Sequence, residues 1–314
     1  MKYLIILFSA ALLFMTAACE KVIKAKNLPQ QDPRLVANCI LYPDSPVVAN
    51  ISVSKSILTS KDYKYLDNAV CELYEDDNFA GNLVYASKGN YTSSVLPKTG
   101  KKYSLKVVAG GYNGVSATTS LPPNVSVTHV ERYDTAGYML SISEYSTGPS
   151  TVVRNLQGLL KYKFSVVDDR LVKNYYSVRP VVILYDEDNN ATRLPYAYIY
   201  NSDNGNSFGN DNNYSSLSLT FDDQVIVNGN EIKLDVKINF SQNLDFSYEL
   251  KNIKIFLEVY NLSPEYYKYQ VTLNDQYNTG ASLFAEPVQV YSNVSNGMGI
   301  VAGVNTNSVL IYPQ

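Results

Sequence analysis

The chain has 314 residues, and its 26 Lys and Arg against 29 Asp and Glu give a formal net charge of −3. This mild acidity, without a run of basic residues, argues against nucleic acid as a partner. The aromatic residues are 28 Tyr and 10 Phe with no Trp. Because Tyr favours strands and has a polar tip that suits exposed surfaces, the composition indicates a β-rich exported protein.

The first 19 residues have the pattern of a bacterial lipoprotein signal. Lys2 precedes an apolar run from Tyr3 to Met15, and small residues then lead into Cys19. Such a segment is removed on export and is not part of the fold, and it is shorter than the roughly 20 residues of a membrane span. A cysteine at the cleavage point resembles a lipobox, so we expect a signal peptide over residues 1–18 and lipidation of Cys19. An ordinary signal peptide with an incidental cysteine is the alternative.

The residues that follow divide into a tether and a first β-rich part. Residues 19–34 are polar and contain two prolines, which is typical of a tether. Residues 35–122 alternate short strand-like segments with turn residues, the pattern of an immunoglobulin-like β-sandwich, and Tyr103 after a turn is compatible with a tyrosine corner. Pro122-Pro123 marks a domain boundary. The expected strands are Leu35–Tyr42, Val47–Ser54, Asn68–Tyr74, Asn82–Ala86, Ser104–Ala109 and Val115–Ser120.

Residues 123–314 predict a larger β-rich domain with one short helix. Asn228-Gly229 predicts a type I′ hairpin between Val225–Val227 and Ile232–Phe240. Ser263 is a natural N-cap for a helix that should reach about Tyr277. The other expected strands are Val125–Val130, Leu160–Val166, Tyr175–Tyr185, Leu217–Phe221 and Asn252–Tyr260, and short strands should finish the chain. The predicted fold class is therefore all-β, with two β-sandwich-like domains.

Two further cysteines, Cys39 and Cys71, each lie in a strand-like stretch. An exported protein meets an oxidising compartment, which permits a disulfide between them. Bridging requires Cα atoms less than about 7 Å apart. Two buried free thiols that act as small apolar side chains are the alternative.

Few residues suit catalysis. His129 is the single histidine of the chain, it lies in a strand-like segment, and no G-x-S-x-G motif accompanies it. A nucleophile needs its base and an orienting group together, so we assign no catalytic residue and expect no enzyme. Asp168-Asp169 and Asp222-Asp223 are more typical of solvated strand ends than of a glycosidase pair, because neighbouring residues in a strand point to opposite faces.

One segment stands out as a candidate contact loop, Asn201–Asn213, which is rich in Asn and Gly. Calcium binds such oxygen-rich segments, as it could the turn at residues 186–190, but the ligand order of an EF-hand is missing. We therefore expect neither a metal nor a cofactor. Exposed loops on a rigid scaffold often carry binding residues, and the candidates here are Asp203, Phe208 and Asp211.

A tyrosine-rich segment precedes that loop. Tyr196, Tyr198 and Tyr200 share one face of a predicted strand, so they can form a flat aromatic ladder suited to stacking on sugar rings. Packing in the hydrophobic core is the commoner fate of such a ladder.

Several phrases of the sequence occur in an order typical of one family. They are Cys19-Glu20-Lys21-Val22-Ile23, Pro43-Asp44-Ser45-Pro46, Asn68-Ala69-Val70 before Tyr74-Glu75-Asp76, Gly100-x-x-Tyr103-x-Leu105, Val167-Asp168-Asp169 with Asn174-Tyr175-Tyr176, Leu262-Ser263-Pro264-Glu265-Tyr266-Tyr267, and Ser292-Asn293-Val294-x-Asn296-Gly297-x-Gly299-Ile300. Together they resemble the lipoproteins of domain-of-unknown-function family 4249. The resemblance implies an outer-membrane lipoprotein, commonly encoded beside a TonB-dependent receptor, with no established activity.

From this resemblance we expect a non-catalytic accessory or ligand-capture partner of a TonB-dependent transporter. The alternative is a structural or adhesive cell-surface protein with no transport role. In either case lipidated Cys19 would hold the protein on the outer membrane, at its periplasmic or its outer face. A disulfide between Cys39 and Cys71 would be peculiar to this chain, because the resemblance implies a small residue in place of Cys39.

Overall fold

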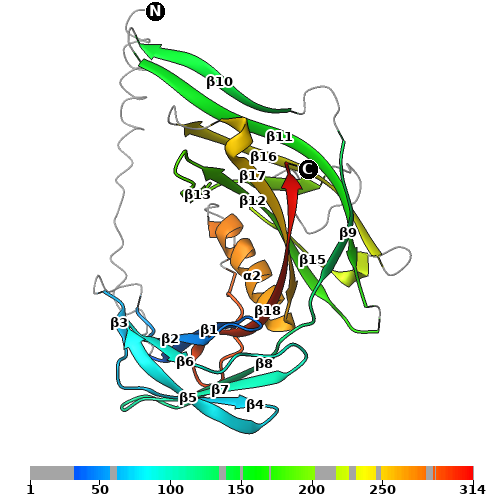
Figure 1. The fold of residues 1–314 in the computed structure, drawn as a ribbon. Helices are drawn as coiled ribbons and strands as arrows, with labels where there is room; N and C mark the ends of the chain where they lie inside the picture. The colour runs from blue at the N-terminus through cyan, green and yellow to red at the C-terminus, as the bar shows by residue number, and fades with distance from the viewer. Residues whose placement is uncertain are drawn as a thin grey trace, which may run out of the picture. The chain divides into compact units, whose positions relative to one another are not determined.

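The computed structural model describes residues 32–56, 62–133, 139–148, 151–169, 171–201, 217–225, 231–244, 249–280, 286 and 288–313. The predicted signal peptide, Cys19 and the tether up to residue 31 lie outside the described residues. Residues Pro33–Gln314 form one compact unit, whose strands and helix are drawn in Figure 1. None of the described helices is long and apolar enough to cross a membrane.

The unit is built mainly from strands, which confirms the all-β prediction. Its first part contains β1 (Leu35–Leu41), β2 (Val47–Val53), β3 (Lys64–Tyr65), β4 (Val70–Glu75), β5 (Asn78–Ser87), β6 (Asn90–Ser93), β7 (Lys102–Val108) and β8 (Val115–Ser120). Its second part contains β9 (Ser126–Arg132), β10 (Met139–Gly148), β11 (Thr151–Val167), β12 (Tyr175–Tyr185), β13 (Ala191–Arg193), β14 (Tyr198–Asn201), β15 (Leu219–Asp222), β16 (Glu231–Leu244), β17 (Ile253–Leu262), helix α2 (Pro264–Gly280) and β18 (Met298–Tyr312).

The strands form two sheets. The larger has 13 strands in the order β13-β12-β17-β18-β1-β2-β6-β5-β4-β7-β8, with β15 beside β12 and β3 beside β2. The smaller has five strands in the order β10-β11-β16-β14, with β9 beside β11.

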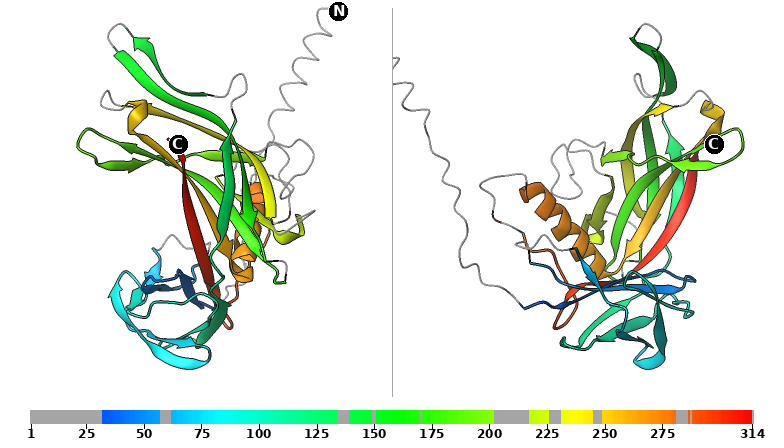
Figure 2. Two further views of the ribbon diagram at one scale, coloured as in Figure 1. Left: turned by 45° about the vertical axis from the view of Figure 1, so that its right-hand side comes forward. Right: turned by 90° about the vertical axis from the view of Figure 1, so that its left-hand side faces the viewer.

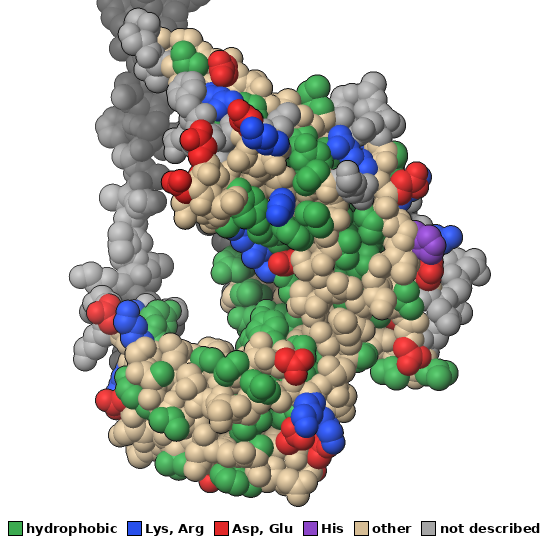
Figure 3. All heavy atoms as spheres, in the orientation of Figure 1, with side chains coloured by type: hydrophobic (Ala, Val, Ile, Leu, Met, Phe, Trp, Pro, Cys, Tyr) green, Lys and Arg blue, Asp and Glu red, His purple; other side chains and the backbone are tan. Residues whose placement is uncertain are grey.

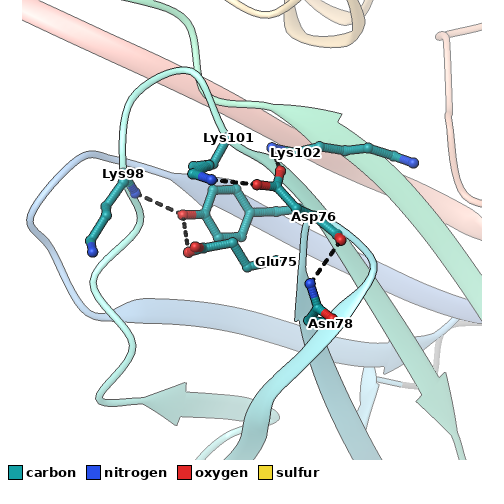
Figure 4. Close-up of polar contacts among 7 residues, drawn as sticks. Glu75, Asp76, Asn78, Lys98, Lys101 and Lys102 are labelled. Atoms are coloured by element: carbon teal, nitrogen blue, oxygen red, sulfur yellow. Dashed lines mark hydrogen bonds and ion pairs between the residues drawn. The ribbon is translucent and has the colours of Figure 1, made fainter.

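The first hydrophobic core lies among β1 to β8, where buried and exposed residues alternate along β1, β7 and β8. Buried Tyr103 supports the predicted tyrosine corner, because its hydroxyl accepts a hydrogen bond from the Lys98 backbone N–H at 2.7 Å and donates one to Glu75 Oε2 at 2.7 Å. Burial, and next the Glu75 carboxylate, raise the pKa of Tyr103 to about 12. Figure 4 shows Glu75 and Lys98 at this corner, with Asp76 held by Lys101 beside them.

The second core lies between the inner faces of the two sheets, with β11 and β16 on one side and β12 and β17 on the other. The predicted alternation in β11 is confirmed for Leu160, Tyr162 and Phe164, which are buried, and for Lys161 and Lys163, which are not. Ser165 was expected on the outer face with the lysines but is buried. The right-hand view of Figure 2 shows α2 to one side of the sheets, and the helix contacts β18, β12, β15 and β17.

One long strand joins the two cores. β18 pairs in parallel with β1 through residues 298–303 and antiparallel with β17 through residues 304–312. Val301 therefore packs in the first core and Ile311 in the second. The prediction of several short strands at the end of the chain is wrong, because β18 is one strand of 15 residues. Its glycines and asparagines interrupt the apolar pattern, and for that reason the sequence suggests shorter strands. The change of core falls between Leu121 and Val125, and independent folding of residues 35–122 and 123–314 stays a prediction.

Close packing explains two of the glycines in β18. A Cβ atom on Gly303 would lie 2.3 Å from the Ser120 carbonyl oxygen. A Cβ atom on Gly299 would lie 2.2 Å from the Ala37 carbonyl oxygen, and the φ of Gly299 is +112°, a conformation that other residues avoid. The glycines therefore let β18 pass directly against its neighbours.

The predicted helix is confirmed at its start. Ser263 accepts a hydrogen bond from the Tyr266 N–H at 3.4 Å, as an N-cap does, and a second one from the Gly303 N–H at 3.2 Å. The helix runs to Gly280 rather than to Tyr277.

The predicted hairpin before β16 is not seen in the described residues. Val225 ends a 3₁₀ turn (Asp223–Val225), so it does not begin a strand. The described neighbours of β16 are β11 and β14. The Asn228-Gly229 turn itself lies outside the described residues.

Candidate functional site

The predicted contact loop lies almost entirely outside the described residues. This holds for Asp203, Phe208 and Asp211, while Asn201 is described only as the last residue of β14. The loop therefore stays a prediction.

Both internal cysteines are free and buried. Burial raises the pKa of each thiol to about 12, and the nearby Cys71 adds to the effect on Cys39. Cys39 lies on β1 and Cys71 on β4, near enough for Cys71 to affect the pKa of Cys39. The structure has the two thiols unbridged, and a disulfide formed on oxidation stays a prediction. A thiol with so high a pKa is a poor nucleophile at neutral pH.

The single histidine lies on the surface. The side chain of His129 is 74% exposed, and its Nδ1 is 3.8 Å from Glu231 Oε2. The residue has a φ of +53°, and it lies at the irregularity in the pairing of β9 with β11. In Figure 3 the histidine is visible on the outside of the molecule, beside basic and acidic side chains.

In the acidic turn at residues 186–190, the carboxylate of Asp186 is hydrogen-bonded to other residues of the turn. Asp186 accepts hydrogen bonds from the backbone N–H groups of Asp188 and Asn190 and from the Asn190 amide. These bonds, led by that of the Asn190 side chain, lower the pKa of Asp186. Among the described residues, no group of three His, Cys, Asp or Glu side chains is arranged to hold a metal ion.

One predicted strand end proves to be buried. Asp168, expected to be solvated, is only 4% exposed, and it lies between the end of β11 and the start of β12. Its Oδ1 accepts hydrogen bonds from the Tyr176 hydroxyl at 2.6 Å and the Asn174 amide at 3.2 Å. Burial and this carboxylate raise the pKa of Tyr176. We call Asp168, Asn174 and Tyr176 the Asp168 cluster.

Further hydrogen bonds tie the Asp168 cluster to neighbouring loops. The Asn174 amide donates to the carbonyl oxygens of Asp169 and Val172, and the Asn174 backbone N–H donates to Asp223 Oδ2 at 2.7 Å. Asp222 instead pairs with Lys173 at 3.2 Å. The cluster therefore closes the β11–β12 connection onto the 3₁₀ turn, which is a structural role.

The tyrosine ladder faces outward rather than into the core. Tyr196 is 59% exposed, and Tyr198 and Tyr200 are half-buried, whereas Ala197 and Ile199 between them are buried. The rings of Tyr196 and Tyr198 are nearly parallel, at 8°, with centroids 6.4 Å apart. The expectation of core packing is therefore wrong, because the strand β14 turns its small and aliphatic residues inward.

A second polar cluster, which the sequence pattern did not indicate, lies on the outer face of the larger sheet. Arg179 of β12 and Glu258 of β17 are directly paired across the two strands. Arg179 donates a hydrogen bond from Nε to Glu258 Oε2 at 2.7 Å, and its Nη2 forms an ion pair with the same oxygen at 2.7 Å. Tyr260 also donates its hydroxyl to this oxygen, and Arg193 of β13 approaches it at 3.6 Å. These four residues form the Arg179–Glu258 cluster.

The charges of this cluster stabilise each other. Burial opposes ionisation of Glu258, but the hydrogen bonds from Tyr260 and Arg179 outweigh it, so the pKa of Glu258 is lowered. Burial likewise opposes the charge on Arg179, but Glu258 outweighs it and raises the pKa of the guanidinium. The pKa of Tyr260 is raised by burial and by its bond to Glu258. Glu258 is therefore a fixed anion and an unsuitable proton donor.

The cluster combines a sheltered carboxylate with accessible cations. The Glu258 side chain is 18% exposed, whereas those of Arg179 and Arg193 are 41% and 50% exposed. The Arg179 guanidinium lies over the Tyr260 ring, 4.9 Å from its centroid. Stacking on an aromatic face fixes the plane of the guanidinium.

Two other parts of the chain reach this site. The pKa of Tyr42, which follows β1, is raised by burial and then by Tyr266 of α2, and the charges of Arg179 and Glu258 also act on it. Helix α2 contacts both β12 and β17, and Tyr42 lies within electrostatic range of the Arg179–Glu258 cluster. In the space-filling view the molecule is hollowed between its two parts, and hydrophobic side chains gather along that hollow (Figure 3).

The sequence held only a faint signal for this cluster. Arg179 and Glu258 each interrupt a predicted strand with a charged residue, but nothing in the sequence shows that the two strands are neighbours. The cluster depends on the pairing of β12 with β17 over a separation of 79 residues.

The family phrases near the C-terminus have a structural explanation. The Asn293 amide donates to the Val301 carbonyl oxygen at 2.7 Å and accepts from the Val301 N–H at 3.0 Å. It also donates to the Thr118 carbonyl oxygen at 3.2 Å. These bonds anchor β18.

The fold defines an all-β protein whose two hydrophobic cores are joined by one strand. Its described residues form polar clusters and no metal centre. The family model described as domain of unknown function DUF4249 matches residues 23–309. The chain belongs to this family. A search of curated proteins finds no match.

Proposed function

We propose that this protein is an outer-membrane lipoprotein that acts as a non-catalytic accessory or ligand-capture partner of a TonB-dependent transporter. The observation that carries the lipoprotein part of the proposal is the N-terminal sequence, which has a charged start, a short apolar run and small residues directly before Cys19. One acyl chain binds a membrane only reversibly, whereas two or more anchor a protein stably.

The Arg179–Glu258 cluster supports capture rather than chemistry. Its guanidinium groups are accessible, and its carboxylate is an anion bound by arginine and tyrosine donors. Such a group holds a ligand by charge and hydrogen bonds, whereas a general base must be free to take up a proton near neutral pH. A structural or adhesive surface protein is the second candidate, favoured by the exposed aromatic ladder at Tyr196 and Tyr198.

Replacement of Cys19 by Ser tests the anchor. We expect the Cys19→Ser variant to leave the membrane fraction and to take up no labelled palmitate, because the acylated thiol is gone. The control Glu20→Gln keeps Cys19 and should stay in the membrane fraction. If wild-type protein takes up no labelled fatty acid, the lipoprotein proposal is wrong.

Co-purification separates the two candidates. Affinity purification of the wild-type lipoprotein from solubilised outer membranes should recover a TonB-dependent receptor. Recovery of the protein without any such receptor, together with binding of intact cells to a surface, would favour the adhesive role.

A further inference from the structure

The arginines of the Arg179–Glu258 cluster have N–H donors that are not directed to Glu258. A guanidinium carries five N–H donors, and Arg179 directs only its Nε and Nη2 to Glu258. The Arg193 to Glu258 distance of 3.6 Å is longer than the 2.7–3.2 Å usual for a hydrogen bond. In the described parts of the chain no second carboxylate pairs with either arginine. Two cations therefore share one anion, so the four residues of the cluster have a net charge of +1.

The outer sheet face next to the arginines carries three apolar side chains and one exposed lysine, Lys254, which is the direct partner of Ile183 across β12 and β17. Ile183 is the direct partner of Arg193 in the pairing of β12 with β13, and Phe256 precedes Glu258 on the same face of β17. Both side chains are half-buried, and Leu310, paired with Phe256, is 42% exposed. A cationic edge and an apolar surface are thus continuous.

We propose that the Arg179–Glu258 cluster binds the carboxylate of a ligand whose neighbouring group is apolar, with the apolar group lying against Phe256, Ile183 and Leu310. This rests on the proposed ligand-capture role and names the chemistry that is captured. The C-terminus of a peptide with an apolar last residue and a fatty acid both present this chemistry.

The geometry matches a carboxylate in charge and in shape. The planar guanidinium fork fits the two oxygens of a carboxylate, and Arg193 can turn to it without breaking a short bond to Glu258. The net positive charge of the cluster attracts an anion such as a carboxylate. Stacking of Arg179 on Tyr260 holds one fork in place before the ligand arrives, which lowers the entropy cost of binding.

Calorimetric titration of the full chain carrying Cys19→Ser, which keeps the lipid out of the measurement, tests the proposal. The probes are N-acetyl-leucine and octanoate, each compared with its uncharged amide. We expect at least one carboxylate to bind and its amide to bind at least about tenfold more weakly, because a charge-assisted hydrogen bond is lost. The tighter of the two carboxylates identifies a peptide terminus or a fatty acid as the source.

Two variants make the test specific. Arg193→Gln should weaken carboxylate binding about tenfold, while its circular dichroism spectrum and thermal midpoint stay those of the parent, since the side chain is half-exposed. Arg34→Gln makes the same change at an exposed arginine that is remote from Arg193 in the sequence, and this variant should bind like the parent. Arg193→Lys should restore only part of the affinity, because the charge returns without the fork.

The outcomes are distinct. Absence of binding of both carboxylates, or equal binding by Arg193→Gln and Arg34→Gln, overturns the inference. If carboxylate binding is lost while the receptor still co-purifies, only this inference fails. If the protein binds carboxylates but recovers no receptor, only the proposed transporter role fails.

Discussion

The two polar clusters along β12 differ in what surrounds them. The Asp168 cluster uses Tyr176, on the inner face of the strand, and its carboxylate is buried. The Arg179–Glu258 cluster begins three residues later, on the outer face, and exposes about half of each arginine side chain. One strand therefore carries a closed cluster and an open cluster on its opposite faces.

The difference teaches which polar groups hold the fold and which remain available. A buried carboxylate must receive hydrogen bonds inside the protein, because no bulk water replaces them. An ion pair that solvent reaches contributes little to stability. We therefore expect the closed cluster to govern stability and the open cluster to govern binding, and the following experiments test that division.

Asp168→Ala should have the largest effect. The substitution leaves the buried Tyr176 hydroxyl without its acceptor and releases the Asn174 amide, so we expect the free energy of unfolding to fall by about 3 kcal/mol. Urea denaturation measures it. Asp222→Ala removes the ion pair with the half-exposed Lys173 and an exposed hydrogen bond from the Gln224 N–H at 3.3 Å, and it should cost less than about 1 kcal/mol. Equal losses in the two variants would contradict the structural role of the Asp168 cluster.

The same substitution in each cluster gives a direct comparison. Tyr176→Phe removes one of the two donors to a buried carboxylate and should lower the free energy of unfolding by about 2 kcal/mol. Tyr260→Phe leaves Glu258 with Arg179 and should cost less than about 1 kcal/mol. Chemical denaturation of both variants at one pH decides. A larger loss for Tyr260→Phe would reverse the comparison.

The smallest effect concerns pH. The pKa of Glu258 is lowered below its ordinary 4.5 in the folded state, so its contribution to stability is complete above the unfolded-state pKa. That contribution disappears as the pH falls through the folded-state pKa. Glu258→Gln lacks it, so stability should fall less steeply with acid than in wild type below about pH 4.5. Thermal midpoints from pH 7 to pH 3 measure this, and parallel curves would refute the contribution.

Much of the fold was predictable from local patterns. The strand Tyr175–Tyr185 was predicted with the bounds of β12, and Ser263 was predicted as the N-cap of the helix. Alternation of apolar residues and capping chemistry act over a few residues, which is why they are readable in the sequence. The long strand β18 was missed because its glycines serve contacts with Ala37 and Ser120, which are remote in sequence.

The candidate site was far less predictable. Asp168 was expected at a solvated strand end, but it is buried and bonded to Tyr176 and Asn174. Tyr196 and Tyr198 were expected in the core, but their strand turns the other face inward. A period of two in a sequence shows that residues share a face, and it does not show which face meets the core when both faces carry apolar side chains.

The sequence by itself determined the all-β class, the family phrases, the helix start and the signal-like segment that ends at Cys19, because each depends on neighbouring residues. Only the tertiary structure decided that Arg179, Arg193 and Glu258 meet on one face and that Asp168 is enclosed. Such groups come together through strand pairing across long separations in the chain. Their exposure then follows from which sheet face packs against the core, since burial is a property of the assembled layers.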